Sequence, residues 1–179
     1  MIEHCVIYLS GSVKKGTNDK RDLSYFWADD QEQYILANVK ARKVILLNPS
    51  KTKIDRADFL AHFGCDLHQI SISDIMLVDF RKEKGIGIGA EMMFAQQNGI
   101  PVISFCPKNT NYRRNLTNFI GQDIADWIHP FVFGLSNAIC STLEECVEEI
   151  NHILSKNNNG DKDMINKAIK HYNRVRETW

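Results

Sequence analysis

The chain has 179 residues, and its 22 basic and 22 acidic side chains give a formal net charge of zero. This length is sufficient for one domain with a substantial core, and a hydrophobic share of 44% is ordinary for a globular protein. The balanced charge argues against a nucleic-acid partner. No apolar segment of the sequence is long enough to predict a membrane span, so we expect no membrane partner.

Cysteine and histidine usage limits the chemistry that the chain can carry. The five cysteines form no CxxC pair, which is typical of a reducing compartment. Residues 1–9 lack a basic segment and a cleavage site, so we expect no signal peptide and a cytoplasmic protein. The histidines have neither HxH nor HxxxH spacing, so we predict no metal site and no cofactor. Cys5 and Cys106 lie within apolar runs and are expected in the core.

Apolar runs alternate with segments of helical periodicity over the first 155 residues. This alternation predicts an α/β fold with a single doubly wound, flavodoxin- or Rossmann-like parallel sheet of five strands and helices on both faces. The predicted strands are residues 5–9, 44–47, 74–80, 101–105 and 127–133. The predicted helices are residues 22–39, 58–70, 90–97, 113–120 and 143–154.

A separate C-terminal region follows this pattern. Residues 157–161 have the composition of a linker, and helical periodicity resumes from about residue 163 to residue 178. We therefore predict an α/β domain over residues 1–155, and a linker with a C-terminal helix over residues 156–179. The helix has one apolar stripe, which we expect to pack on the domain or on a second subunit. The stripe consists of Ile165, Ile169, Tyr172 and Val175.

A glycine-rich segment joins the third predicted strand to the next helix. Gly85, Gly87 and Gly89 alternate with isoleucines, and Glu91 follows closely. Glycines let a backbone approach a ligand, and the helix dipole holds a glutamate in a first helical turn ionised. An ionised carboxylate beside a ligand predicts a nucleophile. The alternative is a tight strand-to-helix turn with Glu91 on the surface.

Two further segments belong at the same edge of the sheet, because ligands bind beyond the carboxyl ends of parallel strands. After the first strand, Gly11, Ser12 and Lys14 offer a small residue, a hydroxyl and a cation that can surround an anion such as phosphate. A solvated turn is the alternative. Asp66 faces this edge if the second helix points its C-terminal half toward the ligand loops. Asp79 is interpreted either as a pocket-rim residue or as a surface residue.

Together these segments resemble the nucleoside 2-deoxyribosyltransferase superfamily, over roughly residues 5–120. Residues 8–11 match its Tyr-x-x-Gly, and residues 87–91 match its Gly-x-Gly-x-Glu. Asp66 precedes the third strand as in the family, and residues 99–102 match Gly-x-Pro-Val. Within the superfamily, residues 8–14 (YLSGSVK) are most similar to the 2'-deoxynucleoside 5'-phosphate N-hydrolases.

The resemblance implies an N-glycosidase that cleaves the base–sugar bond of (2'-deoxy)nucleoside 5'-monophosphates through a covalent glycosyl-enzyme. Glu91 would be the nucleophile, Asp66 would assist the departing base, and Tyr8 would orient Glu91 or contact the sugar. Thr117 would reach the phosphate of a neighbouring subunit, which implies a homodimer or a higher homo-oligomer with a shared active site. The remaining expected substrate contacts are Gly11, Ser12, Lys14, Gly85, Gly87 and Gly89.

Two positions depart from the hydrolase pattern. The residue six before the nucleophile is acidic in the transferases and serine in the hydrolases, and it is Gly85 here. Lys14 stands where arginine is more familiar, which gives up a bidentate contact. The alternatives are therefore a deoxyribosyltransferase that exchanges bases, a glycohydrolase of ribonucleotides or NAD, and a nucleotide-binding module without turnover. The pair of Ser12 and Lys14 argues against the first, because a free 5'-hydroxyl needs no cation.

Overall fold

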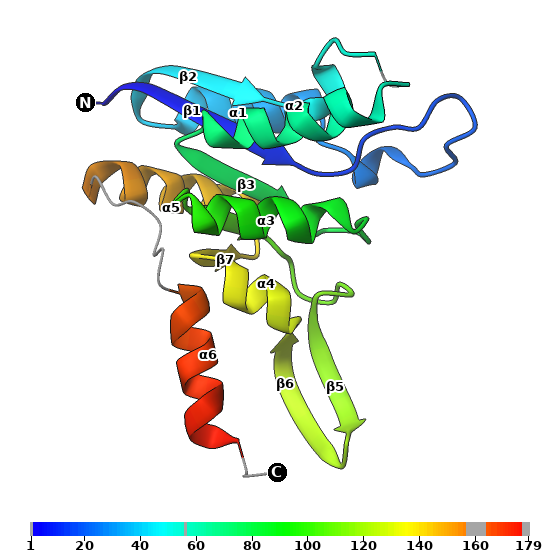
Figure 1. The fold of residues 1–179 in the computed structure, drawn as a ribbon, viewed down its shortest axis with the longest axis vertical. Helices are drawn as coiled ribbons and strands as arrows, with labels where there is room; N and C mark the ends of the chain where they lie inside the picture. Colours follow the sequence, from blue (N-terminus) through cyan, green and yellow to red (C-terminus); the bar gives the residue numbers. More distant parts are fainter. Residues whose placement is uncertain (1, 56, 157–163, 177–179) are drawn as a thin grey trace.

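The computed structural model describes residues 2–55, 57–156 and 164–176. Its centre is a five-stranded sheet in the order β2-β1-β3-β4-β7, and every neighbouring pair is parallel (Figure 1). This confirms the predicted doubly wound sheet. The strands are β1 (Ile2–Ser10), β2 (Ala41–Leu47), β3 (Ile75–Asp79), β4 (Val102–Phe105) and β7 (Ala138–Cys140).

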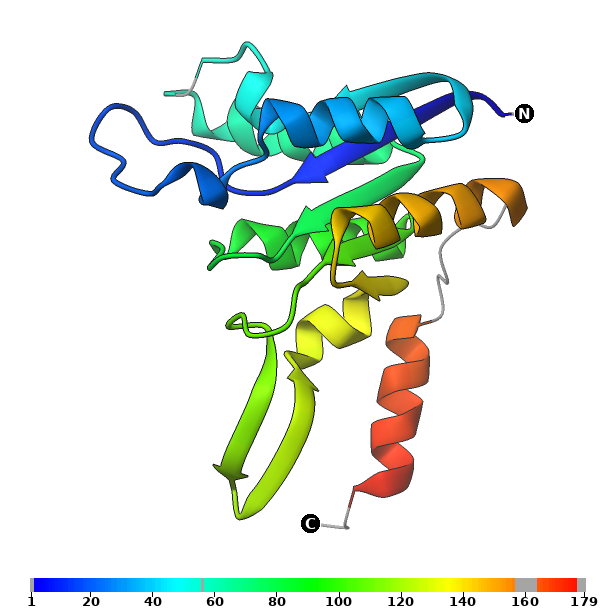
Figure 2. The same ribbon diagram turned by 180° about the vertical axis from the view of Figure 1, so that it is seen from behind.

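Helices cover both faces of the sheet (Figures 1 and 2). Alternate residues of β1 divide between the two faces, as the strand period of two requires. Cys5 and Ile7 pack under α1 (Asp29–Asn38) and α5 (Leu143–Lys156), whereas Tyr8 belongs to the core cluster on the opposite face. That face is covered by α2 (Phe59–Ser71), α3 (Gly87–Gln97) and α4 (Pro130–Leu135).

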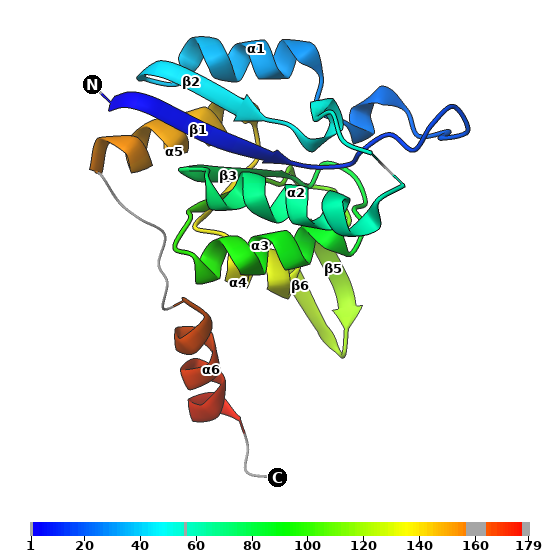
Figure 3. The same cartoon turned by 45° about the horizontal axis from the view of Figure 1, so that its top comes forward.

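The core includes the two cysteines predicted for it but not the first turns of α2. Cys5 and Cys106 are completely buried, as predicted. The first turns of α2 instead reach past the ends of the strands (Figure 3). Phe59, Leu60 and Phe63 are therefore exposed.

The predicted helix over residues 22–39 is interrupted. A short 3-10 helix, η1 (Leu23–Tyr25), is capped by the Asp22 carboxylate, which accepts from the Ser24 N–H at 2.8 Å. The backbone is then extended at Phe26, and Trp27 turns into the core before α1 begins at Asp29. The interruption matters because it places the Trp27 indole at the end of β1.

The segment after β4 also differs from the prediction. Residues 113–120 form a strand, β5 (Arg113–Phe119), which pairs in antiparallel fashion with β6 (Gln122–Ile128). A turn with positive φ at Ile120 and Gly121 joins the two strands. The predicted fifth strand at residues 127–133 is wrong as well, because Pro130 starts α4 and His129 caps it. The fifth strand of the sheet is β7, and the hairpin projects from the domain (Figure 1).

The C-terminal helix is present as α6 (Met164–Val175) and contacts α4. The predicted linker at residues 157–161 lies outside the described residues. Ile165 is partly buried, while Ile169, Tyr172 and Val175 of the predicted stripe are exposed. Within the described part of the chain, no helix combines the length and apolar character needed to cross a membrane.

Candidate functional site

A hydrogen-bonded carboxylate lies where β1 ends beneath α3. Ser10, the last residue of β1, is completely buried. Its hydroxyl donates to Oε2 of Glu91 at 2.6 Å, across 81 positions of sequence. Glu91 is partly buried, and it projects from α3 toward the carboxyl ends of the central strands. This edge of a parallel sheet is where α/β proteins bind their ligands.

Burial sets the protonation of Glu91. Removal of the carboxylate from water raises its pKa to about 7, and the negative charge of Asp66 adds to this increase. The Ser10 hydrogen bond acts in the opposite direction because it favours the charged form. The expectation that the helix dipole holds Glu91 ionised is wrong. The helix starts at Gly87, so Glu91 lies beyond its first turn, and burial dominates.

Tyr8 and Asp66 complete the surroundings of Glu91. The Tyr8 hydroxyl is buried and makes no hydrogen bond of standard geometry among the residues that the structure describes. Burial, followed by the charges of Glu91 and Asp66, raises the Tyr8 pKa and keeps the phenol neutral. Asp66 projects from α2, which packs against α3, and one of its carboxylate oxygens is buried. The structure thus brings all three predicted catalytic residues together.

The three glycines of the β3–α3 segment have different surroundings. A Cβ atom built on Gly87 would lie 3.8 Å from Oε1 of Glu91, so Gly87 is next to the carboxylate. Gly85 and Gly89 instead line a cavity of about 380 Å³ between the start of α3, α4 and the residues that flank the hairpin. Tyr112 and Phe131 lie on the other wall of this cavity. Only one of the three predicted glycine contacts is therefore beside Glu91.

The loop after β1 carries the predicted anion-binding residues. Arg21 holds this loop by donating to the Val13 carbonyl at 2.9 Å and by pairing with Asp19. Ser12 is partly exposed, and Lys14 is exposed and forms no ion pair within the described residues. A free cation and a hydroxyl therefore lie on a loop of fixed shape. Gly11 permits the close approach of Trp27, since a Cβ atom there would lie 3.1 Å from the indole.

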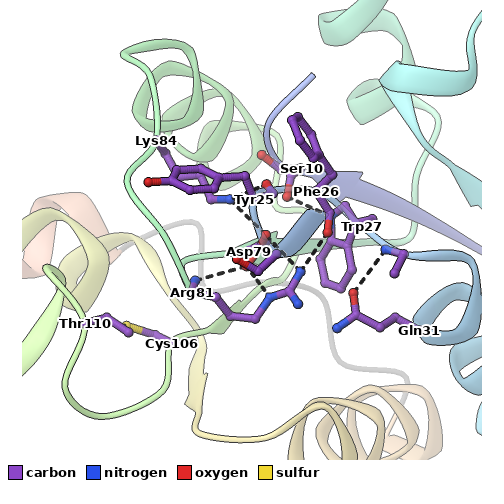
Figure 4. Close-up of polar contacts among 12 residues, drawn as sticks. Ser10, Tyr25, Phe26, Trp27, Gln31, Asp79, Arg81, Lys84, Cys106 and Thr110 are labelled. Atoms are coloured by element: carbon purple, nitrogen blue, oxygen red, sulfur yellow. Dashed lines mark hydrogen bonds and ion pairs between the residues drawn. The ribbon is translucent and has the colours of Figure 1, made fainter. Parts of the chain in front are cut away.

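Asp79, at the end of β3, is neither a pocket-rim nor a surface residue, so both interpretations of it are wrong. Its side chain is 0% exposed and is paired with Arg81 at 2.9 Å and Lys84 at 2.8 Å. Lys84 also donates to the Tyr25 carbonyl, and Arg81 donates to the Phe26 carbonyl (Figure 4). This buried ion cluster fixes the end of the first loop against the β3–α3 segment. Burial outweighs the attraction of Asp79 and lowers the pKa of Lys84.

The remaining candidates lie away from Glu91 or have structural roles. Thr117 is exposed on β5, in the hairpin that projects away from the sheet (Figure 1). Asp74, before β3, accepts a hydrogen bond from the Val6 N–H at 2.8 Å and has a structural role. Over the described ranges of the chain, no cluster of three or more potential metal ligands occurs.

Sequence reasoning did not identify Ser10 as a site residue, nor the contact of Trp27 with it. Ser10 was the one polar residue at the end of an apolar strand, which is a weak signal, and its partner could not be identified without the structure. Trp27 lay within a predicted helix. In the structure its indole N–H donates to the Ser10 carbonyl at 3.1 Å (Figure 4).

Comparisons with known proteins identify the architecture. The sequence matches no protein-family model and no curated protein. Among solved structures, the chain is similar to a 2-deoxyribosyltransferase from the psychrotolerant bacterium Bacillus psychrosaccharolyticus, with a TM-score of 0.52 and 15% identity. The alignment covers 80% of this chain and 90% of that one. The two proteins therefore share an α/β fold.

Proposed function

We propose that this protein is an N-glycosidase that acts on (2'-deoxy)nucleoside 5'-monophosphates with Glu91 as its nucleophile. The observation that carries the proposal is the burial of Glu91 at the ligand-binding edge of the sheet, where Ser10 holds it beside Asp66 and Tyr8. Buried, interacting acids are typical of catalytic sites. The fold shared with a 2-deoxyribosyltransferase supports chemistry at a base–sugar bond.

The residues can divide the reaction into two steps. Cleavage of the bond between C1' and the base leaves positive charge on the sugar, and the ionised Glu91 attacks C1' to form a glycosyl ester. The electrons of the broken bond go to the base nitrogen, which receives a proton from Asp66, so the reactive form of this pair has Glu91 ionised and Asp66 protonated. Water then attacks C1', Asp66 takes up a proton from it, and Glu91 is released as a carboxylate. Tyr8 has a neutral hydroxyl that can donate to Glu91 or to the sugar.

A 5'-phosphate would be held by the loop after β1. Ser12 supplies a hydroxyl, and Lys14 supplies a cation that has no acidic partner in the described part of the chain. The Arg21 contacts with Val13 and Asp19 shape this loop in advance, which reduces the entropy lost on binding. The test for this element is a comparison of each nucleoside with its 5'-monophosphate.

A homodimer with a shared active site fits the exposed surface of the chain. Thr117 lies on the projecting hairpin, where it is better placed to reach another subunit than Glu91 of its own chain. Ile86 and Phe131, at the mouth of the 380 Å³ cavity, are 99% and 65% exposed, and contact with a second copy would cover them. Sedimentation equilibrium of the wild type and of Phe131→Glu should give a dimer or larger assembly and a monomer, respectively.

The deciding experiment is incubation with a panel of deoxyribo- and ribonucleoside monophosphates and deoxynucleosides, followed by chromatography for free base. We expect base release from deoxynucleoside monophosphates and at least about a 1,000-fold loss in Glu91→Gln and Glu91→Ala, whose circular dichroism should match the wild type. Near wild-type rates in either variant would remove Glu91 from the mechanism. Tight nucleotide binding without base release would favour a binding module instead.

Base exchange is the second candidate, and it is favoured by one observation, the fold shared with a 2-deoxyribosyltransferase. A second free base would then replace water in attacking the glycosyl ester. Addition of adenine to a reaction with a pyrimidine deoxynucleoside, with and without the 5'-phosphate, distinguishes the two activities. New deoxyadenosine or its monophosphate would indicate transfer, and free deoxyribose or its 5-phosphate would indicate hydrolysis.

A further inference from the structure

We propose that Ser10 is a positioning residue for Glu91: its hydroxyl binds Oε2 and thereby leaves Oε1 as the oxygen that attacks the sugar. This inference rests on the proposed function, because it assigns a role within the same site. Ser10 itself is completely buried and is not expected to touch substrate. It acts through the 2.6 Å hydrogen bond to the carboxylate.

The two oxygens of Glu91 are not equivalent. Oε2 is engaged by Ser10, whereas Oε1 accepts no hydrogen bond of standard geometry from the residues that the structure describes. Oε1 lies on the side of Gly87, where a Cβ atom would be 3.8 Å away and no side chain is present. The oxygen that Ser10 does not bind is thus also the one next to Gly87, where no side chain covers it. A carboxylate held at one oxygen loses rotational freedom, which favours the reactive geometry.

Ser10 can hold the carboxylate because its own backbone is fixed. It pairs with Val78 of β3 in the sheet, and its carbonyl accepts the Trp27 indole N–H at 3.1 Å. The guanidinium of Arg81 lies over the Trp27 ring, 5.5 Å from its centroid, and is itself held by Asp79 (Figure 4). The buried ion cluster therefore supports the serine through Trp27, although it has no direct contact with Glu91 among the described residues.

A hydroxyl at this position also suits a carboxylate that changes charge during the reaction. It donates to ionised Glu91 and can rotate to accept from the protonated acid. The groups that face Glu91 are Tyr8 and Ser10 from β1 and Asp66 from α2. Of these, Asp66 disfavours the ionised form, whereas Ser10, through its 2.6 Å hydrogen bond, and to a smaller extent Tyr8 favour it. Removal of the Ser10 hydroxyl should therefore shift the titration of Glu91 upward.

The test is the titration of Glu91 in the substrate-free protein, measured by ¹³C NMR with labelled glutamate and assigned by loss of the signal in Glu91→Gln. Ser10→Ala should raise the midpoint by about one pH unit, since a charge-assisted hydrogen bond is lost. Ser24→Ala is the matched control, because it removes an exposed hydroxyl that bonds only to Asp22 in the described structure. An unchanged or lowered midpoint in Ser10→Ala would overturn the proposal.

Kinetics supply the second measurement. In Ser10→Ala the acidic limb of the kcat profile should move to higher pH by the same interval as the NMR titration of Glu91. At pH values above this limb, kcat should fall about tenfold, whereas KM should change less than twofold. A fall in kcat with an unmoved limb would contradict the positioning role and indicate a structural one. Absence of base release from the wild type would instead refute the proposed function. The NMR titration reports the effect of Ser10 on Glu91 in either case.

Discussion

The β3–α3 segment contains one buried and one partly buried carboxylate, Asp79 and Glu91, with opposite electrostatic surroundings. Asp79 has two cations within 2.9 Å, and its side chain is 0% exposed. Glu91 has no cation bonded to it in the described chain, and its neighbours are a hydroxyl, a phenol and another acid. The compensated carboxylate joins the loop after β1 to the sheet. Glu91, which has no such cation, has a pKa raised to about 7, as is common for acids in catalytic sites.

Removal of the compensated carboxylate should have the largest effect on stability. Asp79→Ala leaves Arg81 and Lys84 without their counter-ion, and the Lys84 side chain is 1% exposed. Breaking a buried ion pair from one side should lower the free energy of unfolding by about 3–5 kcal/mol, measured by urea denaturation. The control is Glu3→Ala, which breaks an exposed pair with Arg42 and should cost less than about 1 kcal/mol. Equal losses would contradict the role given to burial.

Glu91→Gln should change stability in the opposite direction, and only at high pH. The pKa of Glu91 is raised from 4.5 to about 7 in the folded chain, so its stabilising effect as a neutral acid is lost between these pH values. Glutamine does not titrate. At pH 8 the variant should be more stable than the wild type by on the order of 2–3 kcal/mol, and at pH 5 the two should be nearly equal. A stability difference independent of pH would argue against a desolvated Glu91.

The same raised pKa predicts the pH dependence of the reaction. The proposed nucleophile has to be ionised, so the acidic limb of kcat/KM should rise about tenfold per pH unit and end near pH 7. Initial rates of base release between pH 4.5 and 8.5 provide the measurement. An acidic limb near 4.5 would mean that Glu91 is as well solvated as a surface glutamate.

Gly85→Ser should have the smallest effect on stability of these variants, and it tests whether this position contributes to substrate binding. No atom lies within 4 Å of a Cβ atom built on Gly85, so the free energy of unfolding should change by less than about 0.5 kcal/mol. The new hydroxyl introduces the residue type that the hydrolases resembled by this sequence have at this position, so under the proposed function KM for deoxynucleoside monophosphates should fall several-fold. Gly11→Ala is the contrasting variant, since its Cβ atom would lie 3.1 Å from Trp27 and should disturb the fold. An unchanged KM in Gly85→Ser would remove this position from substrate binding.

Sequence patterns predicted secondary structure correctly where the burial of a segment can be inferred from its own residues. The first four sheet strands were predicted because continuous apolar runs have few alternatives to burial in a parallel sheet. The hairpin was missed because β5 (RRNLTNF) is polar and half-exposed, so it has neither a strand-like nor a helical apolar pattern. The apolar run at residues 127–133 was divided at Pro130, where a helix starts, and not continued as a strand.

For the site, sequence patterns alone pointed to Glu91, because it follows the glycine-rich segment at the carboxyl edge of the predicted sheet. The roles of Tyr8 and Asp66 were expected from the resemblance to the deoxyribosyltransferase superfamily. The tertiary structure decided their electrostatics. Ser10 meets Glu91 across 81 positions, and Asp79 acquires two cations while Glu91 acquires none. Whether a carboxylate is a support or a nucleophile depends on desolvation and on neighbouring charge, and both arise only when distant segments pack together.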